Sequence, residues 1–356
     1  MKSLKELRQE LDKIDAKILK LLMERLEVVR EVGELKNREG SPIFRPGRER
    51  EQIERLYKLS IQQGWNFKRE EIEAIYSEII SVSRNRERRE RVAFLGPEGS
   101  YTHQAAVKQF GLTTRYLPLN SNDAVFQGVA TGEAKYGVVP IENNTYGQVG
   151  LTLDNLLKYQ ISIIGEICIN VHHSFASITD EIGKIRRIYS HPQAYHQCIK
   201  FLETHNLLDA EFVPTDSTSA AAKLARKDSE SGAICSKIAA KIYNLPLLFE
   251  KIEDNKANKT RFIILSDYLS PKSEQNKTSV IAVTYNRPGA LVELLMKFKE
   301  REINLLKIES RPVKDSGFEK TTFYLEFEGH ATDNHIADIL EQEQMKLLGS
   351  YPRTCV

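Results

Sequence analysis

The most informative segment of the sequence is Tyr136-Gly137-Val138-Val139-Pro140-Ile141-Glu142-Asn143-Asn144. Its short apolar run is typical of a buried strand, and the run ends in an acid followed by two amides. Because Pro140 has no N–H to donate to a neighbouring strand, we expect strand pairing to stop there. Glu142, Asn143 and Asn144 would then point into a crevice, where open α/β sheets bind ligands. The alternative is a strand followed by an ordinary Asn-rich turn, and this segment alone does not separate the two.

The composition indicates a globular protein of several domains. The chain has 356 residues, of which 41% are hydrophobic and 28% charged, and its net charge is +2. This length predicts two or three domains, and the small net charge favours neither nucleic acid nor a membrane as partner. The basic run at residues 84–91 lacks interleaved aromatic residues, so it indicates a solvated helix end rather than a nucleic-acid site.

Targeting and metal signals are missing from the sequence, so we expect a cytoplasmic protein without a metal. The charged segment Lys2–Glu10 has no signal-peptide core, and no apolar run approaches the ~18 residues of a membrane helix. The four cysteines form no CxxC pair, which argues against a zinc ribbon or a disulfide framework and fits a reducing cytosol. His172, His173 and His191 lack a third ligand at metal spacing.

Residues 1–90 are predicted to be helical. Apolar residues recur at helical spacing from Leu4 to Leu35, and further helices are expected after Pro46 to about Gln63 and from about 68 to 88. Three helices bury little apolar surface alone, so this segment should dimerise. Arg25 and Lys36 are eleven residues apart, about three turns, and share one helix face. Alternatively, they are solvated surface charges.

The motifs Leu7-Arg8, Leu22-Met23-Glu24-Arg25, Val32-Gly33 and Arg45-Pro46-x-Arg48-Glu49, with Asp15 and Lys36, resemble the all-helical chorismate mutase family. The resemblance implies that two long helices of a dimer interleave around a cationic pocket. Arg25 and the partner's Arg8 would hold the two substrate carboxylates, and Lys36 would donate to the ether oxygen. Glu49 would contact the ring hydroxyl, with Arg48 and Ser83 nearby. Such a rearrangement needs no nucleophile, only a dianion held in a compact conformer opposite matching charge.

Two positions depart from the family pattern. Arg45 stands where some members have Asp, and Glu87 stands where many have Gln beside the ether oxygen. A Gln can donate to that oxygen, whereas an ionised carboxylate only accepts, so Glu87 would help only when protonated. The alternative is that Glu87 faces solvent and pairs with Arg84 or Arg91 along the helix.

Residues 91–268 alternate between strand and helix signals. The strand Val92–Leu95 leads through a Gly-rich turn into a helix at about His103–Phe110, an arrangement that offers backbone N–H groups to an anion. The turn is neither a Walker loop nor GxGxxG, so no nucleotide is implied. Further strands are expected at 162–169, 187–190, 232–235 and 262–265, with a capped helix start near 216–220. This order predicts two α/β lobes around a cleft, as in amino-acid-binding proteins.

Four motifs in this region together resemble prephenate dehydratase: Gly96-Pro97-x-Gly99-Ser100-Tyr101, Pro140-Ile141-Glu142-Asn143, Ser190-His191-Pro192-Gln193 and Thr260-Arg261-Phe262. The departure is Asn144, where the family often has Ser. The resemblance implies that Thr260 is the main catalytic residue. It implies a cleft lined by Glu142, Asn143, Ser190, Gln193, Gln197, Ser217, Thr218, Ser219, Arg261 and Phe262.

The dehydratase reaction expels a hydroxyl and carbon dioxide together, driven by aromatisation. Threonine is a poor acid, so we interpret Thr260 as a positioned hydrogen-bond donor to the leaving hydroxyl. Arg261 could neutralise a substrate carboxylate. This chemistry needs no cofactor, and the sequence offers no site for one.

The C-terminal region reads as a linker, Ser270–Lys277, and then as strand, helix, strand, strand, helix, strand. The strands are expected at 278–284, 304–312, 321–327 and 346–351, and the helices at 288–302 and 332–343. This is a ferredoxin-like order, which by itself decides no function. Gly289-Ala290-Leu291-Val292 and Glu309-Ser310-Arg311-Pro312 resemble the ACT domain of phenylalanine-regulated dehydratases. The implied role is binding L-phenylalanine at a dimer interface; alternatively, the motifs are only a helix start and a strand end.

The resemblances together predict a multidomain chain with an all-α mutase domain (1–90), a two-lobed α/β dehydratase domain (91–268) and an α+β ACT domain (277–356). It would convert chorismate to prephenate and prephenate to phenylpyruvate, under feedback by L-phenylalanine, as a homodimer or higher oligomer. Two alternatives stay open. One is a dehydratase whose helical part only dimerises, and the other is a non-catalytic amino-acid sensor.

Overall fold

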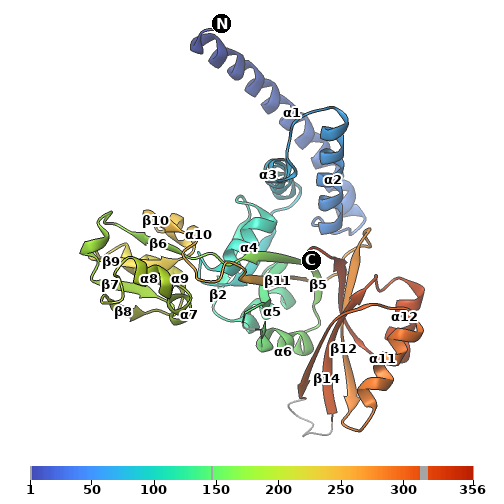
Figure 1. Ribbon diagram of the computed structural model, residues 1–356. Coiled ribbons are helices and arrows are strands. Elements are labelled where there is room, and N and C mark those ends of the chain that lie inside the picture. Colours follow the sequence, from blue (N-terminus) through green and yellow to red (C-terminus); the bar gives the residue numbers. More distant parts are fainter. Residues whose placement is uncertain (1, 146, 313–319, 356) are drawn as a thin grey trace. The chain divides into compact units, whose positions relative to one another are not determined.

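The computed structural model describes residues 2–145, 147–312 and 320–355. The chain forms two compact units, Met1–Glu90 with Phe110–Arg115, and Arg91–Gln109 with Tyr116–Val356 (Figure 1). Within the described ranges, no helix combines the length and apolar character needed to cross a membrane.

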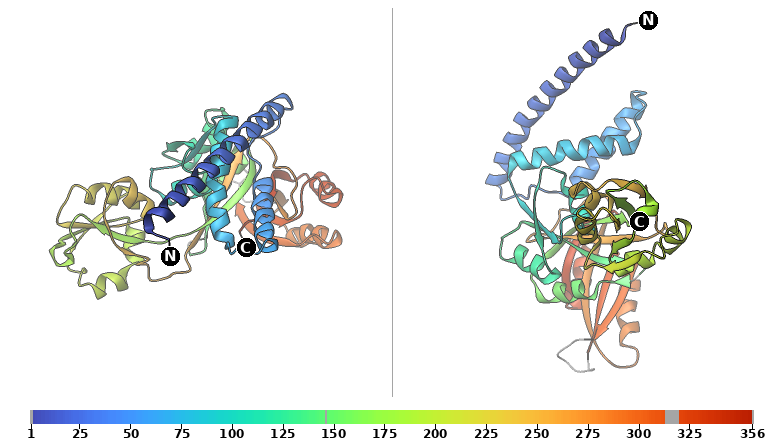
Figure 2. Two further views of the ribbon diagram at one scale, coloured as in Figure 1. Left: turned by 90° about the horizontal axis from the view of Figure 1, so that it is seen from above. Right: turned by 90° about the vertical axis from the view of Figure 1, so that its left-hand side faces the viewer.

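The first unit contains the three predicted helices, α1 (Leu4–Arg38), α2 (Pro46–Gln62) and α3 (Arg69–Glu87). Ser3 and Glu6 form a capping box at the start of α1, and Figure 2 shows α1 as one continuous helix. The apolar residues of its N-terminal half stay exposed, Leu11 at 57% and Ile14 at 50%. An apolar stripe of this extent indicates a surface that another helix covers.

The first lobe of the second unit is a mixed sheet with strand order β2-β1-β3-β11-β5. Its strands are β1 (Arg91–Leu95), β2 (Arg115–Leu119), β3 (Tyr136–Asn143), β5 (Ser162–Asn170) and β11 (Lys259–Ser266), with β4 (Gly147–Gln148) paired to β3. Its helices are α4 (Tyr101–Phe110), α5 (Asn122–Ala130) and α6 (Gly150–Lys158). β1 is parallel to β3, whereas β11 inserts antiparallel between β3 and β5.

The second lobe lies in the chain between β5 and β11. Its sheet has the order β10-β6-β9-β7-β8, from β6 (Ser174–Ser177), β7 (Arg187–Ser190), β8 (Glu211–Pro214), β9 (Ser231–Cys235) and β10 (Leu247–Glu250). Its helices are η1 (Ile182–Lys184), α7 (Pro192–His196), α8 (Ile199–Thr204), α9 (Thr218–Ala225) and α10 (Lys237–Ile242). Phe175, Ile188 and Leu202 lie in a core separate from that of the first lobe. Two lobes with their own cores confirm the predicted α/β architecture.

The C-terminal part has the predicted ferredoxin-like order. It comprises β12 (Asn276–Tyr285), α11 (Ala290–Glu300), β13 (Leu305–Pro312), β14 (Lys320–Glu328), α12 (Asn334–Gln342) and β15 (Lys346–Pro352). The strands form an antiparallel sheet, β13-β14-β12-β15, here called the C-terminal sheet. Asn276 and Lys277, expected in a linker, belong to its strand β12.

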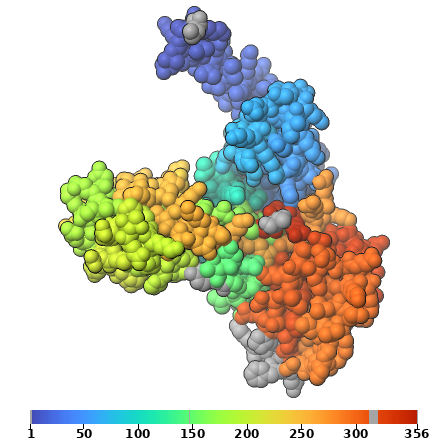
Figure 3. Space-filling view, viewed as in Figure 1, coloured from blue at the N-terminus to red at the C-terminus, as the bar shows by residue number. Residues whose placement is uncertain are grey.

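The C-terminal sheet is covered on both faces. Leu325 and Phe327 pack with Ile336 of α12, and α11 and α12 lie together on one side of this sheet (Figure 1). The C-terminal part forms the orange to red surface in Figure 3. On the other face, Tyr324 and Tyr351 belong to the same core as residues of the first lobe. β15 approaches β5 so closely that a Cβ on Gly349 would lie 2.0 Å from the Ile163 carbonyl oxygen. The C-terminal sheet is therefore part of the second unit's core.

Strand pairing at Pro140 differs from the prediction. β3 continues to Asn143, so Glu142 pairs with Arg261 and Asn143 with Thr260 of β11. The register shifts next to Pro140, between Arg261 and Phe262 of β11, and such a bulge accommodates a residue without an N–H. The expectation that pairing stops at Pro140 was therefore wrong. Because β3 stays extended, Glu142 and Asn143 point to opposite faces of the sheet rather than both into one crevice.

The cysteines also correct an expectation. Cys168 of β5 and Cys355 form a disulfide, with 5.7 Å between their Cα atoms and a sequence separation of 187. The packing of β15 along β5 brings the two together, which cysteine spacing does not reveal. Cys198 and Cys235 are free and buried, and burial raises the pKa of Cys235 to about 12.

Candidate active sites

The first candidate site lies between α1 and α3. Lys36 Nζ is 2.9 Å from Glu87 Oε2, and Arg25 Nη1 donates to Ser83 Oγ. A Cβ on the buried Gly33 would come within 3.1 Å of Glu87 Cγ, so glycine gives this side chain room. The Glu87 side chain is only 7% exposed and contacts Lys36. This corrects the alternative in which Glu87 faces solvent beside Arg84 or Arg91.

A buried ion pair continues this site. Arg84 Nη1 lies 3.0 Å from both carboxylate oxygens of Glu49, and its guanidinium sits over the rings of Phe44 and Phe110. Burial raises the pKa of Glu49 above its ordinary value and outweighs the opposing effect of Arg84. Sequence reasoning missed Arg84 as a site residue because it opens the basic run at 84–91, which reads as a solvated helix end.

Two predicted mutase residues lie away from this cluster. Arg8 is seventeen residues before Arg25 on α1, about 25 Å along the helix axis. Arg48 lies 3.7 Å from Glu51, and its side chain is largely exposed. One chain therefore brings together Arg25, Lys36, Glu49, Ser83 and Glu87 without Arg8.

The second candidate site is at the end of β11, where Thr260 meets Asn143 of β3. Asn143 Nδ2 lies 2.8 Å from both Thr260 Oγ1 and Asn258 Oδ1. The backbone N–H of Thr145 donates to Asn143 Oδ1 over 2.9 Å, which orients the amide. Because the Thr260 hydroxyl accepts from an amide, its own proton can be donated to another oxygen.

A chain of polar side chains links the two lobes. The Tyr101 hydroxyl lies 2.9 Å from His173 Nδ1, and His173 Nε2 lies 2.8 Å from Gln197 Oε1. Burial lowers the pKa of His173, which favours its neutral form. Sequence reasoning considered this histidine only as a metal ligand. Among the described residues, no three His, Cys, Asp or Glu side chains gather as a metal site.

The lobes also touch at the Gly-rich turn. Ser219 Oγ donates to the Glu98 carbonyl oxygen, and Ser236 Oγ donates to that of Gly99 over 2.7 Å. Gly99 has a φ of +83°, and a Cβ there would lie 2.7 Å from Ser219 Oγ. A glycine is thus required where the turn meets the second lobe.

The remaining predicted cleft residues lie at helix starts or in the interior. Ser217 accepts from the Ala220 N–H as the N-cap of α9. The backbone N–H of Gln193 donates to His191 Nδ1 at the start of α7. The other three, all buried, are Ser190, Thr218 and Phe262.

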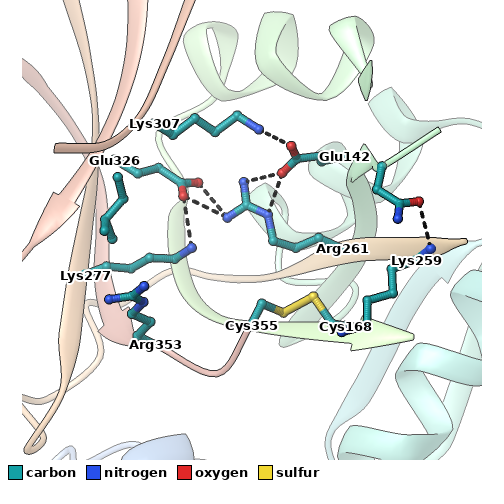
Figure 4. A pocket seen from close by; sticks show the side chains of 11 residues that line it. Glu142, Cys168, Lys259, Arg261, Lys277, Lys307, Glu326, Arg353 and Cys355 are labelled. Carbon is teal, nitrogen blue, oxygen red and sulfur yellow. Dashed lines mark hydrogen bonds and ion pairs between the residues drawn. A yellow bond between two sulfur atoms is a disulfide. The ribbon is translucent and has the colours of Figure 1, made fainter. Parts of the chain in front are cut away.

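Arg261 and Glu142 lie on the opposite face of the sheet from Thr260. Arg261 Nε is 3.1 Å from Glu142 Oε2, and its Nη1 is 2.7 Å from Glu326 Oε1 (Figure 4). Its Nη1 is also 3.1 Å from Glu166 Oε2. Arg261, Glu142 and Glu326 line a cavity of about 530 Å³ against the C-terminal sheet. Arg261 is engaged by three protein carboxylates there, which does not fit the predicted contact with a substrate carboxylate in the cleft.

The charges in this cavity stabilise one another. Burial alone would raise the pKa of Glu326, but Arg261 and Lys277 lower it to about 2. Burial would likewise lower the pKa of Arg261, and the Glu326 carboxylate raises it above its ordinary value. Both groups are therefore charged across the ordinary pH range.

Two kinds of comparison identify the family. The family model described as chorismate mutase type II matches residues 7–88, and the one described as prephenate dehydratase matches residues 92–268. The bifunctional chorismate mutase/prephenate dehydratase of Aquifex aeolicus (strain VF5) is 38% identical over 359 residues, 99% of either chain. The chain belongs to the family of bifunctional chorismate mutase/prephenate dehydratases. The corresponding enzyme of Pseudomonas aeruginosa is 39% identical and covers 98% of either chain.

A solved structure supports the dehydratase part of this bifunctional enzyme. Prephenate dehydratase from Arthrobacter aurescens, in complex with L-Phe, has a TM-score of 0.67 and 34% sequence identity to this chain. The match covers 74% of this chain and 90% of that one. The enzyme thus rearranges chorismate to prephenate and converts prephenate to phenylpyruvate, as predicted. Matches to both domains disfavour the inactive helical domain and the non-catalytic sensor.

The predicted effector residues lie at two places in the C-terminal part. Gly289, with a φ of +84°, is the N-cap of α11, which continues through Ala290, Leu291 and Val292. Glu309, Ser310, Arg311 and Pro312 end β13, an edge strand of the C-terminal sheet. Arg311 Nη2 lies 3.4 Å from Asp154 Oδ1 of α6. Arg311 therefore has a structural partner in the first lobe.

Proposed function

We propose that the dehydratase step uses the Thr260 hydroxyl as the hydrogen-bond donor to the departing hydroxyl of prephenate. The observation that carries this is the 2.8 Å contact from Asn143 Nδ2, which leaves the Thr260 proton free to donate. Loss of carbon dioxide breaks a C–C bond and releases its electron pair into the ring, while the C–O bond breaks and the hydroxyl departs with the electron pair of that bond. The departing hydroxide becomes water by taking a proton from solvent. A donor held at the leaving oxygen stabilises the charge that develops there.

For the mutase step, we propose that Arg25 and the partner's Arg8 bind the two carboxylates of chorismate. Lys36 then donates to the ether oxygen, while Glu49 contacts the ring hydroxyl. The cluster around Glu87 and the exposed apolar stripe of α1 support this proposal, because the stripe offers a dimer surface beside Arg8. Arg48 contributes from the exposed side of α2.

We further propose that the C-terminal part is an ACT domain that binds L-phenylalanine through residues 289–292 and 309–312. Its ferredoxin-like topology and the L-Phe bound in the related Arthrobacter aurescens structure support this role. Binding that favours one dehydratase conformation over another would inhibit the enzyme by shifting their populations.

One set of assays measures both activities and tests the effector proposal, whereas the proposed roles of Thr260 and Arg8 are tested by substitutions at those residues. The purified enzyme is given chorismate or prephenate, with and without L-phenylalanine, and prephenate and phenylpyruvate are quantified. We expect phenylpyruvate from either substrate and less of it from prephenate when L-phenylalanine is present. Phenylpyruvate formation that is unaffected by millimolar L-phenylalanine would contradict the effector proposal while leaving both activities in place.

A further inference from the structure

Strand β11 carries two adjacent residues that face different parts of the second unit. Successive side chains of a strand point to opposite faces, so Thr260 faces Asn143 while Arg261 faces Glu142. The face with Arg261 is the one against the C-terminal sheet, as Figure 4 shows. Thr260, which carries the proposed catalytic hydroxyl, is therefore the immediate neighbour in the chain of Arg261, whose side chain contacts the C-terminal sheet.

Six charged side chains from two sheets meet on this face. The first lobe supplies Arg261 with Glu142 and Glu166, which sum to a charge of −1. The C-terminal sheet supplies Glu326 with Lys277 and Lys307, which sum to +1. These six side chains are joined by ion pairs across the two sheets, and their charges sum to zero.

The contacts of Glu326 fix the direction of the Arg261 side chain. Arg261 Nη1 lies 2.7 Å and 2.9 Å from the two Glu326 oxygens, and Lys277 Nζ lies 2.9 Å from Glu326 Oε2 and 2.6 Å from Glu166 Oε2. The side chains of Arg261 and Glu326 are only 8% and 3% exposed. Solvent screens such buried contacts little, so a small displacement of β14 would pull on Arg261.

We propose that Glu326 and Lys277 are positioning residues for the dehydratase step, acting through Arg261 on the placement of Thr260. The proposal rests on the role of Thr260 proposed above and assigns part of the dehydratase machinery to strands β12 and β14. The ion pair with Glu326 holds the guanidinium of Arg261 against the C-terminal sheet. This contact fixes the position of the N-terminal end of β11, and with it the distance between Thr260 and Asn143.

The test is a double-mutant cycle in the full-length enzyme with Glu326→Gln and Arg261→Gln. We expect each single variant to lower the dehydratase kcat at least tenfold with KM within threefold, because prephenate still binds but Thr260 is displaced. The double variant should be no slower than the slower single variant, since both changes break one connection. The mutase activity of all three should equal that of the parent enzyme.

Glu328→Gln is the matched control. Glu328 is on the same strand and pairs with Arg353, 2.7 Å away, without contacting Arg261. We expect its dehydratase kcat to stay within twofold of the parent. Should Glu326→Gln not fold, Glu326→Asp keeps the charge, withdraws it by one methylene, and should lower kcat by between twofold and tenfold.

Three results would overturn the positioning role: an unchanged kcat in a folded Glu326 variant, multiplicative losses in the double variant, or a loss confined to thermal stability. The Thr260→Ala variant separates the positioning role of Glu326 from the proposed role of Thr260 as hydrogen-bond donor. If that variant keeps its dehydratase activity, the proposed role of Thr260 fails. If activity depends on Thr260 but not on Glu326, only the positioning role fails.

Discussion

At the scale of single residues, the hydrogen bond from Asn143 to Thr260 leads to a prediction about the rate of the dehydratase step. Thr260→Ala should lower phenylpyruvate formation from prephenate by about 100-fold or more, because the leaving hydroxyl loses its donor. Thr260→Ser keeps the hydroxyl and should retain most of the rate. The mutase assay on the same preparations is the control, since its proposed residues lie in the other compact unit. A Thr260→Ala enzyme within tenfold of the parent would remove Thr260 from the mechanism.

The ion pair between Lys36 and Glu87 makes a second residue-scale prediction. The Glu87 carboxylate holds the Lys36 ammonium at 2.9 Å, and a carboxylate cannot donate to the ether oxygen of chorismate. Glu87→Gln removes the competing carboxylate and supplies an amide N–H, so it should raise the mutase kcat/KM at neutral pH.

Glu73→Gln serves as the control for Glu87→Gln, because Glu73 is an exposed residue of the same helix α3. Its mutase kcat/KM should match that of the parent enzyme. If Glu87→Gln also leaves kcat/KM unchanged, the second donor to the ether oxygen must come from another residue.

Much of both sites could be predicted from motifs, whereas the direction of individual side chains could not. Regular helical spacing places Arg25 and Lys36 on one face of α1, where they contact Ser83 and Glu87 of α3, the two residues that the family resemblance assigned to this site. Glu142 was expected in the cleft because Pro140 was expected to end strand pairing, and Arg261 was expected there from the family motif. The bulge beside Pro140 instead keeps β3 extended, and no sequence signal marked that bulge. Side chains alternate between the two faces of a strand, so a strand that continues for a few more residues changes the direction in which those side chains point.

At the scale of elements, α1 is a long helix with an exposed apolar stripe, and the proposal above places a second copy of the chain on it. If the partner's Arg8 completes the site, chains carrying Arg8→Ala and chains carrying Arg25→Ala should each lack mutase activity. Co-expressed, they should recover about a quarter of the parent's mutase activity, because half of the dimers would be mixed and each would hold one intact site. No recovery in mixed dimers would show that Arg8 does not act across the dimer. The dehydratase rate of the same samples normalises the amount of folded enzyme.

Glu326 of strand β14 leads to a prediction about the stability of the fold at acidic pH. The pKa of Glu326 is lowered in the folded enzyme to about 2, so the stability it contributes is complete above its ordinary pKa of 4.5. That contribution, about 3 kcal/mol, is lost as the pH falls through this interval. Thermal unfolding of the parent enzyme should show the loss, and Glu326→Gln should lack this part of the pH dependence. Equal pH slopes for the two proteins would mean that Glu326 is not ionised against Arg261.

Element boundaries were predictable to different degrees. The three N-terminal helices and the ferredoxin-like order follow from regular apolar periodicity. The position of β11 between β3 and β5 pairs it with residues that lie 89 to 128 positions earlier in the sequence. The hydropathy of a short segment does not identify its distant partner strand. For the same reason, the packing of β15 against β5 could not be predicted.

At the scale of the whole molecule, the C-terminal part is joined to the first lobe more extensively than a sequence linker suggests. Tyr324 and Tyr351 belong to the core of the first lobe, and Glu326 balances the charge of Arg261. Removing residues 277–356 would expose that core and leave Arg261 with two carboxylates. Point substitutions in the motifs at 289–292 and 309–312 therefore test feedback more cleanly than truncation.

The bond between Cys168 and Cys355 ties the polypeptide into a covalent ring that contains the second lobe and the C-terminal sheet. A ring of 187 residues restricts the unfolded chain, which in the chain-entropy model stabilises the folded state by about 5 kcal/mol. The oxidised protein should therefore migrate faster than the reduced one on a denaturing gel, and reductant should lower the unfolding temperature of the second unit. Cys355→Ser should be indifferent to reductant in both measurements. Equal migration of the untreated and reduced parent would mean that the ring is open in solution.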